Sequence, residues 1–118
     1  MRGDPLRERT YQFALKTART IAPLFRDPVG RGIANQLFRS AWSVASNTRV
    51  IKHARSNADF ISKMSIVAEE GEESAMWLEA LKDLKLMEPG AVGQLHSEAC
   101  ELTAIAVASI KTARNALR

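Results

Sequence analysis

Apolar residues recur every three or four positions along four stretches of the chain, which is the spacing of one face of an α-helix. These stretches predict helices at about residues 5–24, 31–53, 57–86 and 92–117. No segment alternates apolar and polar residues over a useful length, so no strand is predicted. The connections between the helices are short, which favours antiparallel packing. The pattern therefore predicts an all-α protein, with residues 1–118 forming one domain folded as an up-down-up-down four-helix bundle.

One stripe of residues on each predicted helix is expected to face the core. In chain order, the four stripes are Leu6, Thr10, Phe13, Thr17 and Ile21; Ile33, Leu37, Ala41, Val44, Thr48 and Ile51; Phe60, Met64, Val67, Gly71, Ser74, Leu78 and Leu81; and Leu95, Ala99, Leu102, Ala106, Ser109, Ala113 and Leu117. A glycine inside a helix costs about 1 kcal/mol relative to alanine. Gly71 therefore indicates a point where a neighbouring helix approaches closely, and the small side chains of Ala68 and Ala75 lie close to it in sequence.

Several residues mark the expected helix ends. Asp4 is expected to cap the first helix, with Pro5 in its first turn. Ser56, followed three residues later by Asp59, forms a variant of the capping box and predicts the start of the third helix. The segment 87–90 contains a proline and a glycine and is expected to end that helix.

The composition is that of an ordinary globular protein, with 46% hydrophobic and 25% charged residues. The longest apolar run, residues 104–108, is far shorter than the roughly 20 residues that cross a bilayer. The N-terminal residues contain no apolar segment that would serve as a secretory signal. Cys100 is the only cysteine, so an internal disulfide is excluded, which fits a reducing compartment. We therefore expect a cytoplasmic protein without a membrane span.

Charge is distributed unevenly along the chain. Residues 1–56 contain 11 Lys/Arg and 3 Asp/Glu, whereas residues 57–118 contain 6 Lys/Arg and 10 Asp/Glu. Antiparallel helices of opposite charge can pair within the bundle or between subunits, which is the simpler explanation. A basic face can alternatively bind the phosphate backbone of a nucleic acid.

If nucleic acid is bound, the candidate residues are the cations on the outer positions of the second predicted helix and just beyond it. These candidates are Arg31, Arg39, Arg49, Lys52 and Arg55. The first helix would add Arg7, Arg9, Lys16 and Arg19. No groove-reading motif is visible, so such binding is expected to be sensitive to salt and to show little base specificity.

Five parts of the chain resemble, in the correct order, one known protein family. Residues 35–47, Asn-Gln-Leu-Phe-Arg-Ser-Ala-Trp-Ser-Val-Ala-Ser-Asn, resemble the signature Gln-Leu-x-Arg-Ser/Ala-Ala-x-Ser-Val-x-x-Asn of the "four helix bundle protein" family. Residues 54–64 resemble its Ala-Arg-Ser-x-x-Asp/Glu-Phe-Ile-x-Lys stretch, and residues 69–78 its acidic segment ending in Trp-Leu. Residues 98–105 and 108–114 also fit. This family is also called the 23S ribosomal-RNA intervening-sequence protein family.

The resemblance implies a left-handed four-helix bundle that assembles as a ring, typically a homopentamer. Members of the family are encoded inside intervening sequences of large-subunit ribosomal RNA genes. A related branch acts as the accessory subunit of the reverse transcriptase in diversity-generating retroelements, and that branch is basic and binds nucleic acid. The resemblance thus suggests self-association, RNA or DNA, and a reverse transcriptase as partners, but no settled activity.

The chain departs from the family pattern at one position of the second helix. The family has a Glu three residues after the signature Asn, which is Asn47 here, whereas this chain has Val50. If that Glu pairs with an arginine in relatives, Arg39 or Arg55 has lost its partner in this protein.

No arrangement of residues predicts catalysis, a metal or a cofactor. Glu69, Glu72 and Glu73 share a helix face, but neither histidine follows a Glu by three residues, as a di-metal bundle requires. A solvated or ion-paired acidic face is the expected explanation, with Glu73 paired to an arginine of the second helix. Cys100 has no neighbouring His-Asp pattern and is expected to be a small core or interface residue.

Three further residues are expected to have structural or interface roles. Asn47 is interpreted as a buried polar group that sets helix register, although a role at the helix end is also open. Trp42 and Trp77 are expected in the core or at subunit contacts, where large amphipathic rings are common, with Trp42 at an edge.

Two functions fit this sequence. The first is a non-enzymatic, ring-forming bundle that acts as a scaffold for nucleic acid or a nucleic-acid enzyme through its basic surface. The alternative is a protein–protein adaptor without nucleic-acid binding, whose basic and acidic halves pair between subunits.

Overall fold

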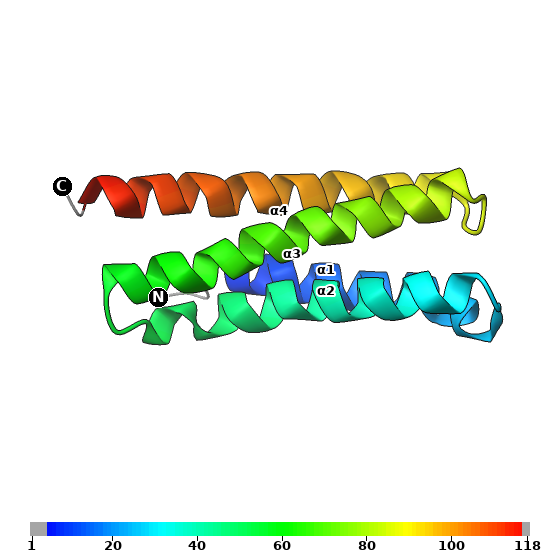
Figure 1. The fold of residues 1–118 in the computed structure, drawn as a ribbon, viewed down its shortest axis with the longest axis horizontal. Helices are drawn as coiled ribbons and strands as arrows, with labels where there is room; N and C mark the ends of the chain where they lie inside the picture. Colours follow the sequence, from blue (N-terminus) through cyan, green and yellow to red (C-terminus); the bar gives the residue numbers. More distant parts are fainter. Residues whose placement is uncertain (1–4, 117–118) are drawn as a thin grey trace.

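The computed structural model describes residues 5–116 and consists of four helices joined by short connections (Figure 1). The four helices are α1 Pro5–Ile21, α2 Gly30–Val50, α3 Asn57–Asp83 and α4 Pro89–Ala116. Two short 3₁₀-helices, η1 Ala22–Arg26 and η2 Ile51–His53, continue α1 and α2. Residues 5–116 contain no strand, and successive helices run in opposite directions (Figure 1). The all-α bundle is thus confirmed, and its left-handed sense stays a prediction.

The core is formed by the stripes that the hydrophobic spacing predicts. The largest fully buried side chains include Phe13 of α1, Leu37 of α2, Leu78 of α3 and Leu102 of α4. Stripe residues near the helix ends, such as Leu6, Ile33 and Ile51, pack against this core while remaining partly exposed. The expected stripe residue Leu117 and the expected cap Asp4 lie outside the described residues.

Helix α3 begins where the capping box predicts. The Ser56 hydroxyl accepts a hydrogen bond from the Asp59 backbone N–H at 3.1 Å. The Asp59 carboxylate in turn accepts one from the Arg55 N–H at 3.0 Å and pairs with the Lys63 ammonium at 2.9 Å. The Lys63 bond, followed by the Arg55 bond, lowers the pKa of Asp59 to about 2. The bond to Ser56 satisfies a backbone donor that the first turn of a helix leaves free, and the bonds of Asp59 fix the segment that enters the helix.

The segment 87–90 has a different role from the one predicted. Helix α3 ends earlier, at Asp83, and the predicted stop begins α4 instead. The Glu88 carboxylate accepts a hydrogen bond from the Ala91 N–H at 2.8 Å, which lowers the pKa of Glu88. Pro89 is the first residue of α4, where its missing N–H costs nothing. A proline preceded by a side-chain acceptor is a start signal, so the sequence interpretation of this segment was wrong.

Helix α3 ends in a Schellman motif without a glycine. Lys85 adopts a left-handed backbone conformation, with φ of 58°, and donates its N–H to the Lys82 carbonyl at 3.0 Å. The Leu86 N–H donates to the Leu81 carbonyl, also at 3.0 Å. Leu86 packs against the core, as is usual for the residue after the left-handed position.

Small side chains let α3 pack closely against both of its neighbours. On the α4 side, a Cβ added to Gly71 would collide with the Thr103 hydroxyl oxygen, so only glycine fits without a shift. On the α2 side, the buried hydroxyls of Ser40 and Ser74 lie 2.9 Å apart. Since Ser40 donates to the Leu37 carbonyl, Ser74 supplies the proton of this bond. The close approach expected at Gly71 is confirmed.

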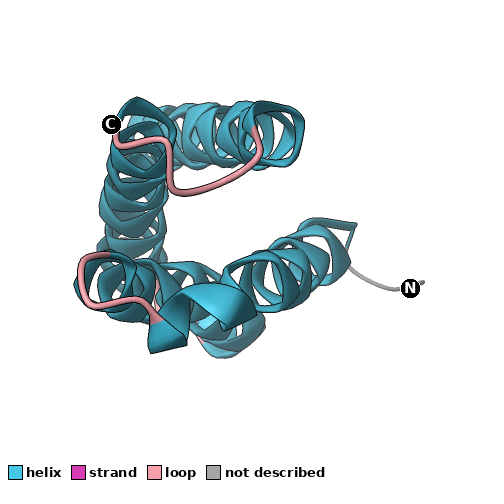
Figure 2. Ribbon diagram, turned by 90° about the vertical axis from the view of Figure 1, so that its right-hand side faces the viewer, coloured by secondary structure: helices cyan, strands magenta, loops and turns pink. Residues whose placement is uncertain are grey.

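The bundle is not equally tight on all sides. Contacts are extensive between α2 and α3 and between α3 and α4, but sparse between α1 and α4. Seen end-on, the helices form an open C instead of a closed ring (Figure 2). None of the helices in the described part of the chain is long and apolar enough to cross a membrane.

Replacing Gly71 with alanine tests the close α3–α4 approach. Gly71→Ala should lower the free energy of unfolding by about 1–3 kcal/mol, because overpacking outweighs the gain in helix propensity. In a Thr103→Ala background the nearest side-chain atom to the new Cβ is the residue-103 Cβ, at 3.5 Å. There the same substitution should instead stabilise by about 1 kcal/mol. Urea denaturation of the four proteins measures both effects, and stabilisation by Gly71→Ala alone would contradict the predicted clash.

Candidate nucleic-acid interface

A row of aromatic side chains crosses the outer face of α1, η1 and α2. The ring centroids of Phe25 and Phe38 lie 6.4 Å apart, those of Phe38 and Trp42 6.3 Å, and those of Trp42 and Tyr11 6.0 Å. The ring planes are steeply inclined to one another, an arrangement that favourable quadrupole interactions prefer. Phe25 and Phe38 keep 37% and 41% of their surface exposed. We call these four residues the aromatic row.

Two arginines of α2 share a helix face with this row. Phe38 and Trp42 stand four residues apart, Arg31 lies seven residues before the first of them, and Arg49 seven after the second. These intervals keep all four residues on one side of a helix. The Arg49 guanidinium lies 5.5 Å from the centroid of the Tyr11 ring, within the range of a cation–π contact.

The five predicted cations do not form one cluster. All five are exposed, but Lys52 lies in η2 and Arg55 in the connection to α3. Arg55 also lies 3.5 Å from the Asp59 carboxylate. Among residues 5–116, no ion pair is formed by Arg31, Arg39 or Arg49. Three of the five candidates therefore lie along α2, and the other two lie beyond its end.

The α3 carboxylate on which an α2 arginine acts is Glu70 and not the predicted Glu73. Burial raises the pKa of Glu70, the charges of Glu73 and Glu69 raise it further, and the charge of Arg39 lowers it. Glu73 itself is exposed and lines a groove with residues of α4, so the predicted ion pair with an α2 arginine is absent. The physical reason is the helical turn, since three residues rotate a side chain by about 300°.

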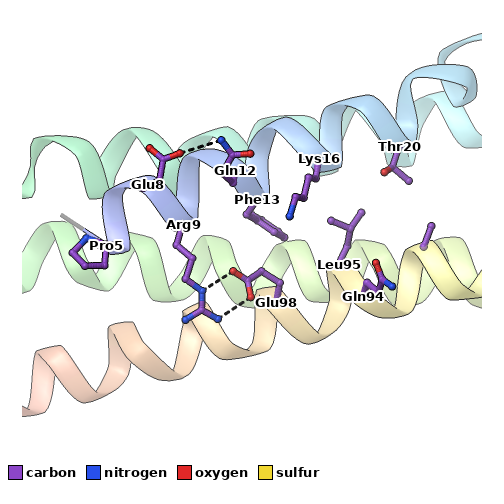
Figure 3. A pocket seen from close by; sticks show the side chains of 11 residues that line it. Pro5, Glu8, Arg9, Gln12, Phe13, Lys16, Thr20, Gln94, Leu95 and Glu98 are labelled. Carbon is purple, nitrogen blue, oxygen red and sulfur yellow. Dashed lines mark hydrogen bonds and ion pairs between the residues drawn. The ribbon is translucent and has the colours of Figure 1, made fainter. Parts of the chain in front are cut away.

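Arg9 is occupied and does not contribute to a free basic surface. Its guanidinium binds both carboxylate oxygens of Glu98 across the open side of the bundle, each at 2.8 Å (Figure 3). It also bonds to Glu101. The Glu98 bonds, then the Glu101 bond, raise the pKa of Arg9 above its already high value. Lys16 and Arg19 of α1 are exposed and remain available.

The ion pair between Arg9 and Glu98 lies in a cleft between α1 and α4 that has a volume of about 710 Å³. Phe13 and Leu95 contribute apolar surface to this cleft, and Lys16 extends over it (Figure 3). Its charged groups are of both signs, and the most central pair neutralises itself. The cleft thus carries no concentration of one charge that would select a nucleic acid.

An acidic groove of about 610 Å³ lies between α3 and α4. Glu69, Glu72 and Glu73 line it, all exposed. At one end the Glu79 carboxylate lies 2.9 Å from the His96 Nε2. Among residues 5–116, no group of three or more potential ligands is placed to hold a metal ion.

Cys100 lines the acidic groove, which excludes the core position, and the alternative of an interface residue stays a prediction. Its side chain is exposed, and its Sγ lies 3.9 Å and 4.0 Å from the two ring nitrogens of His96. Near-equal distances to both nitrogens mean that the sulfur does not point at either nitrogen along a hydrogen-bond direction. Position 100 lies one residue after the buried Ala99, so its side chain is rotated out of the core.

The three residues expected to have structural roles are half-buried. Asn47 donates to the Ser43 carbonyl at 2.9 Å and contacts the Ser43 hydroxyl at 3.2 Å, both within α2. No described hydrogen bond of Asn47 reaches another helix, so nothing here supports a role in register. Trp42 and Trp77 pack against the core, and their indole N–H groups have no hydrogen-bond partner among the described residues.

The aromatic row was not predicted from the sequence. Phe38 and Trp42, four residues apart within the positively charged second helix, were a visible signal for part of it. Phe25 and Tyr11 join the row only through tertiary packing, because they belong to η1 and α1. The ion pair between Arg9 and Glu98 joins residues 89 positions apart, so no local sequence pattern could predict it.

Fold and surface together define a small four-helix-bundle protein with a basic, aromatic face and an acidic groove. The model of the 23S rRNA-intervening sequence protein family matches residues 6–108, and the chain belongs to this family. The structure is also similar to a crystal structure, at 1.70 Å resolution, of a protein of unknown function from the S23 ribosomal protein family of Bacteroides thetaiotaomicron VPI-5482. The TM-score is 0.82 at 24% identity, with 90% of this chain and 95% of that chain covered, which establishes the shared fold alone. The search of curated proteins finds no match.

The raised pKa of Glu70 predicts a dependence of stability on pH. A carboxyl group with a raised pKa in the folded state binds its proton more tightly there, so its ionisation costs stability as pH rises above the ordinary value of 4.5. Glu70→Gln should therefore raise the melting temperature at pH 7 and have little effect below pH 4.5. Glu72→Gln, an exposed carboxylate of the same helix, is the matched control. Equal effects of both substitutions at pH 7 would contradict the assignment to Glu70.

Proposed function

We propose that this protein is a non-enzymatic, ring-forming cytoplasmic scaffold that associates with nucleic acid through the α2 face bearing Arg31, Arg39 and Arg49. The observation that carries the proposal is the combination of charge and aromatic surface on that face. Its three arginines are exposed without an ion pair among the described residues, and the rings of Phe25 and Phe38 lie exposed beside them. Phosphate oxygens would take the place of the missing carboxylates.

The arrangement of the arginines supports backbone contacts more than base-specific ones. Arg31 and Arg49 are 18 residues apart, which along an α-helix is about 27 Å. A flexible single strand of RNA or DNA would span this distance, and contacts to its phosphates would carry no sequence information. Low base specificity therefore follows from this face.

Assembly would strengthen such binding. In a homopentamer, the ring that the family resemblance suggests, five copies of a weak basic face would act together and raise the overall avidity. A reverse transcriptase is a candidate partner because a related branch of the family serves one. Both the ring and this partner are part of the proposal.

The test is a binding titration with labelled single-stranded RNA over a range of salt concentrations. Binding should weaken steeply with salt, because each phosphate contact contributes about −0.7 to the slope of log K against log salt. The triple variant Arg31→Gln, Arg39→Gln, Arg49→Gln should reduce the magnitude of that slope by about two. The control replaces three exposed cations elsewhere, Lys82, Lys111 and Arg114, with Gln. Absence of wild-type binding at low salt, or equal loss in both variants, would sink the proposal.

A specific observation favours a second function, that of a protein–protein adaptor whose subunits pair through charge. The exposed carboxylates Glu69, Glu72 and Glu73 make no ion pair within residues 5–116. They complement the three unpaired arginines of α2 and lie on a different helix. Two patches of opposite charge on separate faces of one subunit would suit the head-to-tail contacts from which rings are built.

Charge reversal distinguishes the adaptor from the nucleic-acid scaffold. If the acidic and basic faces pair between subunits, changing Glu69, Glu72 and Glu73 to Lys should dissociate the assembly in analytical ultracentrifugation. Reversing Arg31, Arg39 and Arg49 to Glu in the same chain should then restore it, since complementarity returns with exchanged signs. An assembly that survives the acidic reversal alone would rule out this pairing.

A further inference from the structure

A pocket of about 590 Å³ opens where the chain turns from η1 into α2. Five residues line it: Phe25, Pro28, Arg31, Gly32 and Asn35. It adjoins the aromatic row, because the Phe25 ring forms part of its wall and packs edge-on against Phe38. Its volume lies within the range of sites that hold small molecules or single residues of a polymer.

The lining offers three kinds of contact. The rings of Phe25 and Pro28 are apolar surfaces against which a flat ring can lie. The Arg31 guanidinium is exposed and forms no ion pair within the described part of the chain. The Asn35 side-chain amide is exposed and offers both donors and an acceptor.

We propose that this pocket takes one unstacked base of a single-stranded nucleic acid, stacked on Phe25, with an adjacent phosphate on Arg31. The proposal rests on the proposed function and narrows its ligand from nucleic acid in general to single strands. Base–aromatic stacking needs an exposed base face, which a duplex does not offer. The basic face of α2 continues from the pocket towards Arg49, so the rest of the strand would follow it.

Asp27 determines where the phosphate lies. The first backbone N–H groups of a helix often bind phosphate, but here the Asp27 carboxylate accepts from the N–H groups of Val29 and Gly30, at 3.0 Å and 2.6 Å. The Arg31 N–H is bonded to the Asp27 carbonyl at 2.8 Å. These donors are taken, and the Asp27 charge repels a phosphate from the helix end. The phosphate is therefore assigned to the Arg31 side chain and not to the end of the helix.

Gly32 allows the pocket to be filled without disturbing the fold. A Cβ built on Gly32 meets no atom within 4 Å. Gly32→Leu should thus place a side chain in the pocket, while removing a helical glycine. Gly93 of α4 is also exposed and also has open space around an added Cβ, so Gly93→Leu is a matched control.

The experiment measures fluorescence anisotropy of a labelled single-stranded RNA and of the same sequence as a duplex, at low salt. The wild type and Gly93→Leu should bind the single strand more tightly than the duplex. Gly32→Leu should weaken single-strand binding about five- to 150-fold, the range found when one stacked base loses its aromatic partner, and leave duplex binding unchanged. Phe25→Leu, which keeps apolar bulk but removes the aromatic face, should act in the same direction. Thermal melts verify that all variants fold.

Photo-cross-linking adds a readout that a purely structural effect would not move. A strand containing 4-thiouridine, irradiated on the wild type and digested with trypsin, should give adducts in the peptides of residues 20–39, which contain all five lining residues. Gly32→Leu should lose these adducts, and Gly93→Leu should keep them.

The outcomes separate this proposal from the proposed function. If the wild type binds no nucleic acid at low salt, both fail. If it binds single strand and duplex equally and Gly32→Leu changes neither, the base pocket is wrong while the basic face stands. Cross-links confined to segments outside residues 20–39 would likewise overturn the pocket.

Discussion

The close approach of α3 to its two neighbours is the constraint on which the rest of the structure depends. On one side only a hydrogen atom at position 71 separates the α3 backbone from the Thr103 hydroxyl, and on the other the hydroxyls of Ser40 and Ser74 share a buried hydrogen bond. These contacts hold α2, α3 and α4 together as one tightly packed unit. Because α2 is held by its inner face, its outer face is presented to solvent as a rigid surface.

The two sides of the molecule are held by different forces. Apolar stripes and small residues join α2, α3 and α4, whereas a bidentate ion pair joins α1 to α4 across the cleft. The surfaces of the α2 face and of the groove between α3 and α4 also differ in their side chains. The α2 face combines arginines with aromatic rings, while the groove between α3 and α4 gathers carboxylates around His96 and Cys100. No ion pair of the described residues joins α2 to α3, so these two surfaces stay separate, whereas Arg9 of the basic half pairs with Glu98 and Glu101 of the acidic half.

Helical periodicity predicted the helices and nearly all of the core, because burial in a bundle is determined by which side of a helix a residue occupies. The predictions of individual side-chain positions failed where a shift of a few residues along a helix turns a side chain to a different face. Glu70 lies beside Arg39 although Glu73 was expected to pair with an α2 arginine. Of the two roles expected for Cys100, the core position is excluded because the side chain points outward beside buried Ala99, and the interface role stays a prediction. The stop predicted at 87–90 is a start, since Glu88 caps α4. The aromatic row could not be predicted from residue spacing, because it forms by packing between elements that are separate in the sequence.

The single electrostatic clamp on α1 has a consequence for how the molecule opens. Arg9 and its carboxylate partners are partly exposed, so their attraction is modest and falls with ionic strength. On its α4 side, α1 is therefore held mainly by a contact that dissolved salt weakens. On its other side, α1 packs against α2 through buried residues such as Phe13 and Ile21, and salt does not weaken that packing. Loss of the ion pair would thus free only the edge of α1 that faces α4, and the packed seam between α1 and α2 would act as the hinge.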